Sequence, residues 1–158
     1  MASIFLSPSV QEYNPYITGG NEEQYMNLIA DAMMPYLEAS GIQVTRNDPD
    51  EPVTAAIAAS NAGYYDLHLA LHSNAAPDSL SGQLQGPDVY YYRGSVRGQE
   101  AATIFANNLK WIYPDPDLVT VIPNTTLAEL RRVTAPAVLI ELAYHDNYAD
   151  AEWLKNNI

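Results

Sequence analysis

Residues 66–72 read Asp-Leu-His-Leu-Ala-Leu-His, and residues 137–141 read Ala-Val-Leu-Ile-Glu. Both stretches are short and almost continuously apolar, which is typical of strands that are buried on both faces of a sheet. Each stretch ends on a polar side chain, His72 in the first and Glu141 in the second. Because function in open α/β sheets collects beyond the carboxyl ends of strands, these residues are the first candidates for a site.

The rest of the chain alternates predicted strands and helices, which favours crossover connections. Asn21 is a plausible N-cap and Gly41 a stop for the first helix, in which Pro35 predicts a kink. Residues 127–131 fit either one helical turn or an edge segment. The other strands are expected at 3–6, 42–45, 89–92 and 118–122, and the other helices at 53–63, 99–111 and 149–157.

We therefore predict one α/β domain that spans residues 1–158. Its central sheet is expected to be mostly parallel or mixed, with helices on both faces. The last predicted helix looks cut short by the end of the sequence.

Composition excludes several classes of function. The chain has no cysteine, which excludes disulfides, thiolate zinc ligands and cysteine nucleophiles. A net charge of −12, with only seven scattered Lys and Arg residues, argues against nucleic acid and anionic membrane surfaces as partners. No apolar run is long enough to cross a bilayer, and no signal peptide is visible in this sequence.

The two histidines of the first stretch differ in what they can do. On a helix, His68 and His72 would share one face and could bind one zinc ion. On a strand they still share a face, but a rise of ~3.3 Å per residue separates them by ~13 Å. We therefore interpret His68 as structural, or at most as a support for a ligand, and keep His72 as the candidate.

The candidate carboxylates are ordinary residues when each is taken singly. Glu141 could be a strand-end carboxylate that accepts hydrogen bonds from nearby backbone amides. Glu22 and Glu23 could be acidic residues that complement the dipole of the first helix. A decision needs the order and context of these residues along the chain.

Four stretches in order resemble the type 3 zinc N-acetylmuramoyl-L-alanine amidases, and they span nearly the whole chain. Residues 21–28 are similar to the helix that carries a glutamate ligand four residues before an Asn-Leu pair, which selects Glu23 over Glu22. Residues 66–75 resemble the strand that carries a histidine ligand, His72, followed by x-Asn-Ala. Residues 86–92 and 135–147 resemble the next strand and the segment of the catalytic glutamate, Glu141.

One departure from the family concerns the third zinc ligand. The family usually has a histidine just after the first strand, whereas residues 7–10 here read Ser-Pro-Ser-Val. The place could be taken by His145, by the amide oxygen of Gln11, or by no residue at all. We favour His145, because imidazole binds zinc far better than an amide and Glu/His/His sets occur in catalytic zinc sites.

The resemblance implies zinc-dependent hydrolysis of the amide between N-acetylmuramic acid and L-alanine in peptidoglycan. Glu141 would take a proton from the attacking water and pass it to the leaving nitrogen, and Asn74 is a candidate substrate contact. The protein is expected to act as a monomer, outside the cell or in the cell wall. The alternatives are a relative that binds peptidoglycan without cutting it and a zinc hydrolase that acts on another amide.

Overall fold

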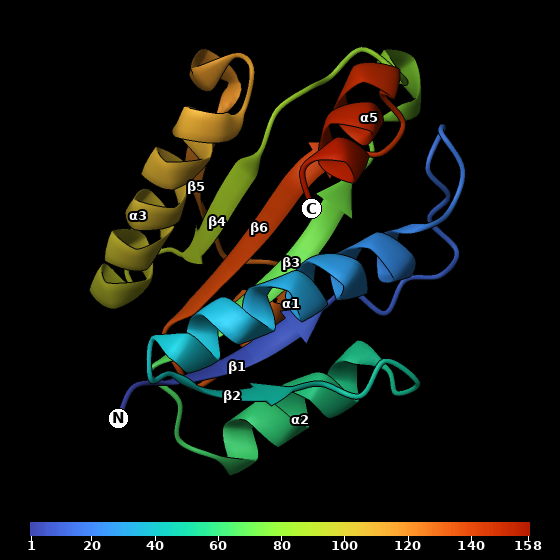
Figure 1. The fold of residues 1–158 in the computed structure, drawn as a ribbon. Helices are drawn as coiled ribbons and strands as arrows, with labels where there is room; N and C mark the ends of the chain where they lie inside the picture. Colours follow the sequence, from blue (N-terminus) through green and yellow to red (C-terminus); the bar gives the residue numbers. More distant parts are fainter.

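The computed structural model describes residues 1–158, which form one six-stranded mixed sheet with strand order β2-β1-β3-β6-β4-β5 (Figure 1). Four strands run parallel to one another, while β4 is antiparallel to β6 and parallel to β5. The strands are β1 (Ser3–Pro8), β2 (Gln43–Arg46), β3 (Leu67–Asn74), β4 (Asp88–Tyr92), β5 (Thr120–Asn124) and β6 (Ala137–Tyr144). The predicted α/β class with a mostly parallel or mixed sheet is confirmed.

The helices begin close to the residues that the sequence indicates. Asn21 caps the first helix by accepting a hydrogen bond from the backbone N–H of Gln24, and Pro35 lies inside that helix. The helices are α1 (Glu22–Ala39), α2 (Val53–Ala62), α3 (Val96–Ile112), α4 (Ala128–Arg131) and α5 (Tyr148–Asn156), with short 3₁₀ turns η1 (Asp78–Leu80) and η2 (Pro116–Leu118). The segment 127–131, for which two interpretations were open, is a helical turn.

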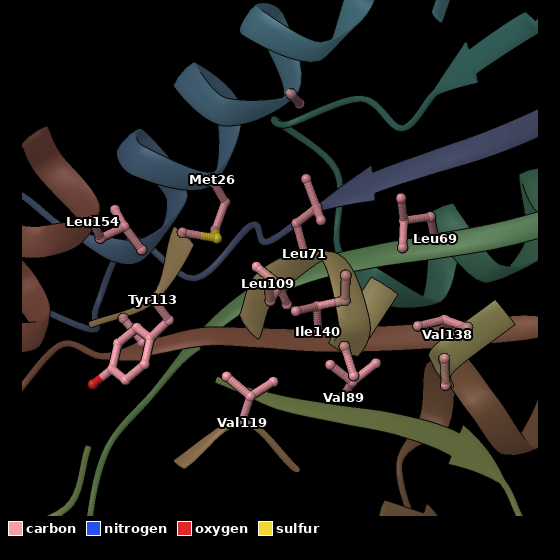
Figure 2. Close-up of a cluster of buried hydrophobic side chains, with 14 of the residues drawn as sticks. Met26, Leu69, Leu71, Val89, Leu109, Tyr113, Val119, Val138, Ile140 and Leu154 are labelled. Atoms are coloured by element: carbon pink, nitrogen blue, oxygen red, sulfur yellow. The ribbon is translucent and has the colours of Figure 1, made fainter. Parts of the chain in front are cut away.

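Helices cover both faces of the sheet, as predicted. On one face, side chains of α1, α3 and α5 pack against Leu69, Leu71 and Ile140 in the main apolar core (Figure 2). On the other face, Ala70 and Leu139 pack against Leu130 of α4. None of the helices is long and apolar enough to cross a membrane.

The alternation of side chains along β3 decides which residues meet on each face. Leu69 and Leu71 enter the main core, so His68 and Ala70 face α2 and α4. Both β3 and β6 run past the residues that were expected to end them, β3 to Asn74 and β6 to Tyr144. The pairing of the two strands shifts register between His72 and Asn74, which lies at the edge where the candidate site residues gather.

Candidate active site

His72 and Glu141 are direct neighbours in the sheet. They are register partners across the parallel strands β3 and β6, and Asp88 of β4 is the partner of Glu141 on its other side. Register partners in adjacent strands have side chains on the same face of a sheet. The two residues that sequence patterns placed at the ends of two separate strands are therefore brought together.

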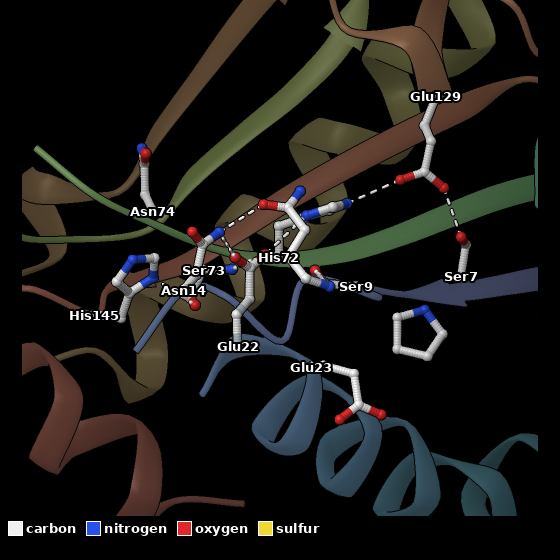
Figure 3. Close-up of polar contacts among 12 residues, drawn as sticks. Ser7, Ser9, Asn14, Glu22, Glu23, His72, Ser73, Asn74, Glu129 and His145 are labelled. Carbon is white, nitrogen blue, oxygen red and sulfur yellow. Dashed lines mark hydrogen bonds and ion pairs between the residues drawn. The ribbon is translucent and has the colours of Figure 1, made fainter. Parts of the chain in front are cut away.

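Glu22, at the start of α1, is the carboxylate that reaches His72. Its Oε1 lies 2.9 Å from His72 Nδ1 and 3.3 Å from the backbone N–H of Ser73. Asn14 donates a hydrogen bond of 2.6 Å to its Oε2. The side chain is 1% exposed, so this acidic residue is directed into the protein (Figure 3).

Glu23, which counting along the sequence selected as the ligand, is not brought to His72. Its Oε1 instead accepts a hydrogen bond of 3.2 Å from Asn27, one turn further along α1. Successive helical residues point about 100° apart, since an α-helix has 3.6 residues per turn. Because Glu22 is the first residue of α1 and faces the sheet, Glu23 turns away, and Figure 3 shows its carboxylate apart from the cluster.

A second carboxylate, Glu129 of α4, meets His72 from the other side of the imidazole ring. Its Oε2 lies 2.8 Å from His72 Nε2. Its Oε1 lies 3.1 Å from His68 Nε2 and accepts a hydrogen bond of 2.5 Å from Ser7 Oγ. Glu129 is 3% exposed, so one buried carboxylate joins β1 to both histidines of β3.

These contacts set the protonation of the cluster. Burial opposes the charged form of His72, but the hydrogen bonds to Glu129 and Glu22 outweigh it and raise the pKa of His72 well above 6.5. Burial alone would raise the pKa of Glu22 and of Glu129, but their interactions with the histidines together outweigh it. They lower the pKa of Glu22 and bring the pKa of Glu129 down to about 2.

Glu141 is in the opposite condition. Burial raises the pKa of its carboxyl group, His72 lowers it, and the neighbouring carboxylates of Glu22 and Asp88 raise it, with a resulting pKa of about 7. Its Oε2 is buried and has no hydrogen-bond partner. A carboxyl group of this kind exchanges protons near neutral pH and has a free oxygen for an incoming donor.

The two candidates for the third ligand make different contacts near the Glu22–His72 pair. His145 is 4% exposed, its Nδ1 lies 2.9 Å from Ser73 Oγ, and its ring stacks on Tyr16. Burial lowers the pKa of His145. Asn14 donates hydrogen bonds both to the side-chain oxygen of Gln11 and to Glu22. Gln11 also lines the same cavity as His72. Neither side chain contacts His72 or Glu22 directly.

Asn74, the candidate substrate contact, lies at the last position of β3. Its Oδ1 accepts a hydrogen bond of 2.9 Å from the backbone N–H of Ala75, and its carbonyl oxygen accepts from the backbone N–H of His145. Figure 3 shows the side chain apart from the His72 cluster.

The donor set fits zinc at two positions. No group of three or more His, Asp or Glu side chains has the spacing of a metal site. Two ligands of a tetrahedral zinc ion are about 3.3 Å apart, given bond lengths of ~2.0–2.1 Å, and the His72 Nδ1 to Glu22 Oε1 distance is 2.9 Å. Glu141 lies next to His72 in the sheet, and its unpartnered Oε2 can accept a proton or interact with a cation.

Two hollows mark the surface around these elements. One, of about 300 Å³, is lined by Ser9, Gln11, Asn47, His72 and Glu129, among others. The other, of about 380 Å³, is an apolar groove between α1, α3 and α5 that includes none of the candidate residues. Of these two hollows, only the smaller, more polar one is lined by His72.

Sequence reasoning missed Glu129, Ser7 and Asn14. Glu129 lies between Ala128 and Leu130 in Leu-Ala-Glu-Leu, residues 127–130. A carboxylate with apolar neighbours in a short turn is a weak signal of burial. Ser7 and Asn14 carried no signal, because their roles depend on contacts with residues that are distant in sequence.

Comparison with known proteins identifies a family for this chain. The sequence model of the family described as N-acetylmuramoyl-L-alanine amidase matches residues 10–158. A search of curated proteins found no match.

Among solved structures, the fold is similar to an N-acetylmuramoyl-L-alanine amidase from Clostridium difficile 630, with TM-score 0.85, 18% identity, and coverage of 99% of this chain and 87% of that one. It is also similar to the amidase AmiC2 of Nostoc punctiforme, with TM-score 0.82, 17% identity, and coverage of 99% and 87%. A third similar structure is the catalytic domain of the CD27L endolysin targeting Clostridia difficile, with TM-score 0.80, 24% identity, and coverage of 99% and 89%.

The family match covers far more than half of the chain, and its order of strands and helices is that of amidase catalytic domains. The residues expected from the resemblance, His72 and Glu141, lie side by side at the edge of the sheet with a buried glutamate beside them. The chain is an amide hydrolase that belongs to the N-acetylmuramoyl-L-alanine amidase family.

Proposed function

We propose that this chain is a zinc-dependent amidase that hydrolyses the bond between N-acetylmuramic acid and L-alanine in peptidoglycan. The observation that carries the proposal is the pair formed by Glu22 Oε1 and His72 Nδ1, 2.9 Å apart, with Glu141 next to His72 in the sheet. The family match supports the bond that is cut. The glutamate of the ligand pair is Glu22 in this proposal, because Glu23 is engaged with Asn27.

His72 and Glu22 would hold the metal. Zinc, when bound, supplies a Lewis acid that activates water and polarises the amide carbonyl. Asn14 and the backbone N–H of Ser73 hold the Glu22 carboxylate in place through hydrogen bonds. This support fixes the ligand before the substrate arrives, so little reorganisation is needed at the moment of reaction.

Glu141 would act as the general base and then as the general acid. Its free Oε2 accepts a proton from the water that attacks the amide carbon. As the new C–O bond forms and the C–N bond breaks, the same proton passes to the nitrogen of L-alanine. A pKa of about 7 suits both directions of this transfer at neutral pH.

The third protein ligand is proposed to be His145 or Gln11. His145 is the stronger donor in chemical terms, and it would have to exchange its contact with Ser73 for the metal. Gln11 lies on the same hollow as His72. Zinc affinities of His145→Ala and Gln11→Ala separate these two, because only the variant that lacks a ligand loses affinity by tenfold or more.

Because its proposed substrate lies in the cell wall, the protein is proposed to act extracellularly or in the wall. It is also proposed to act as a monomer. Asn74 is proposed to contact the substrate through its side-chain amide nitrogen, since its Oδ1 already accepts from Ala75. Tighter substrate binding by the wild type than by Asn74→Ala, seen as a lower KM, would support this role.

The function is tested by incubating the purified zinc-loaded protein with peptidoglycan and labelling the new amino groups. We expect amino-terminal L-alanine to be released without new reducing sugar ends. A chelator should stop the release and added zinc should restore it. Release of sugar ends alone, or no release by a zinc-loaded sample, would contradict the proposal.

A second candidate is a relative that binds peptidoglycan without cutting it. It is favoured by one observation, the absence of three convergent His, Asp or Glu ligands. The same assay discriminates the two. A binding protein would sediment with peptidoglycan whether or not zinc is present, and it would release no alanine.

A further inference from the structure

Glu129 is a buried, charged side chain that the proposed reaction does not use. Its carboxylate is 3% exposed and lies on α4, outside the four stretches that resemble the amidase family. It receives three hydrogen bonds, from Ser7 Oγ at 2.5 Å, His68 Nε2 at 3.1 Å and His72 Nε2 at 2.8 Å. Burying a carboxylate costs free energy unless it is paired and hydrogen-bonded in this way.

The contact fixes which nitrogen of His72 keeps its proton when a metal binds. An ionised carboxylate has only acceptor atoms, so His72 Nε2 must donate to Glu129. Nδ1 faces the Glu22 carboxylate at 2.9 Å and donates to it in the metal-free protein, so zinc would bind at Nδ1 by displacing that proton. The proton and the metal are thereby assigned to opposite sides of the ring.

Glu129 itself is held so that it does not compete for the metal. Its two oxygens are occupied by the donors of Ser7, His68 and His72, and it meets the ring at the nitrogen remote from Glu22. His68 is in turn fixed by Ser60 Oγ, 2.9 Å from its Nδ1, and by stacking on Phe5. A chain of contacts therefore runs from α2 through His68 and Glu129 to His72.

We propose that Glu129 is the positioning residue of the zinc site. By accepting the Nε2 proton of His72 it orients the ring and leaves Nδ1 for zinc, and His68 and Ser7 hold Glu129 in place. The inference rests on the proposed zinc-dependent function and adds to it a residue beyond the expected ligand set. Carboxylates that accept from the remote nitrogen of a ligating histidine raise metal affinity about 10–100-fold.

The test compares the wild type with Glu129→Gln, with Glu100→Gln as the matched control. Glu100 is an exposed residue of α3, so its variant removes one negative charge from the surface. Zinc affinity is measured by competition with a coloured chelator, and folding is checked by circular dichroism. We expect Glu129→Gln to bind zinc about 10–100-fold more weakly and Glu100→Gln to bind as the wild type does.

A second readout reports the ring itself. ¹⁵N NMR of the zinc-loaded wild type should show the metal on Nδ1 of His72 and the proton on Nε2. If Glu129→Gln does not fold, Glu129→Asp keeps the charge but shortens the side chain by one methylene, and we expect about a tenfold loss of zinc affinity.

The outcomes separate the two proposals. If the wild type binds no zinc, the proposed function fails and the inference falls with it. If the wild type binds zinc on Nδ1 and the folded Glu129 variants bind it equally well, the positioning role alone is overturned. Zinc on Nε2 of His72 would overturn the inference and leave a zinc-dependent function standing.

Discussion

The two halves of β3 place a histidine in two different environments. His68, in the first half, is 0% exposed and has a neutral hydroxyl, Ser60 Oγ, at its Nδ1. His72, at the far end of the same strand and on the same face, has a carboxylate, Glu22 Oε1, at its Nδ1. Both donate from Nε2 towards one carboxylate, Glu129. The difference is therefore confined to one nitrogen of each ring.

Position along β3 thus decides which partner each histidine meets at its Nδ1. His68 lies between the sheet and α2, is fully buried, and does not line the hollow of about 300 Å³. His72 lies where α1 begins and where the hollow of about 300 Å³ reaches the sheet. The same residue type thus supports Glu129 at one site and is proposed to bind zinc at the other.

The largest expected effect is a contrast between the two histidines. His72→Gln should weaken zinc binding more than ~100-fold and reduce hydrolysis to background, since it removes a ligand. His68→Gln should keep zinc affinity within about tenfold and lower the free energy of unfolding by about 1–3 kcal/mol, because buried hydrogen bonds are lost. Chelator competition and urea unfolding measure the two quantities, and equal loss of zinc in both variants would break the comparison.

The next effect concerns Glu141, which borders His72 but is proposed to carry a proton and not the metal. Glu141→Gln should lower kcat about 10²–10⁴-fold, the usual contribution of a general acid–base residue. Zinc affinity should stay near that of the wild type. A variant that hydrolyses peptidoglycan at the wild-type rate would show that another group moves the proton.

A smaller effect distinguishes the two adjacent glutamates of α1. Glu22→Gln should bind zinc at least tenfold more weakly, because an amide oxygen replaces a carboxylate next to His72 Nδ1. Glu23→Gln is its matched control, with the same change one residue away on a side chain that contacts Asn27. The assignment is reversed if only Glu23→Gln loses metal.

The last effect is on the pH dependence of stability without metal, which does not involve zinc or hydrolysis. The pKa of Glu129 is lowered from 4.5 to about 2 in the folded protein. Its stabilising contribution is therefore complete above pH ~4.5 and is lost as the pH falls towards 2. Between pH ~4.5 and ~2, the free energy of unfolding of the metal-free wild type should fall by up to about 3 kcal/mol more than that of Glu129→Gln, as measured by urea unfolding. Parallel profiles for the two proteins would mean that Glu129 is not held as an ionised carboxylate.

The fold could be predicted largely from the sequence, because its signals are local. The apolar runs at 67–71 and 137–140 became the central strands β3 and β6, and Asn21 marked the start of α1. The ends of strands were less predictable. Both β3 and β6 continue past the polar residue that was expected to end them, since neighbouring strands go on supplying hydrogen bonds there.

Of the candidate site residues, only those on strands could be placed together from the sequence. The positions of His72 and Glu141 follow from two apolar runs that pair in the sheet. The choice between Glu22 and Glu23 depends on the rotation of α1 over the sheet, which counting along the sequence does not give. The contact of Glu129 with His72 joins residues 57 positions apart, and no local pattern encodes such a distance.

A crystal structure of the zinc-loaded protein tests most directly whether Glu22 and His72 hold a zinc ion. We predict zinc within ~2.2 Å of His72 Nδ1 and of a carboxylate oxygen of Glu22, with Glu129 still bonded to His72 Nε2. Zinc held by Glu23, zinc on the Nε2 side of the ring, or no zinc at His72 in a metal-saturated crystal would contradict the claim.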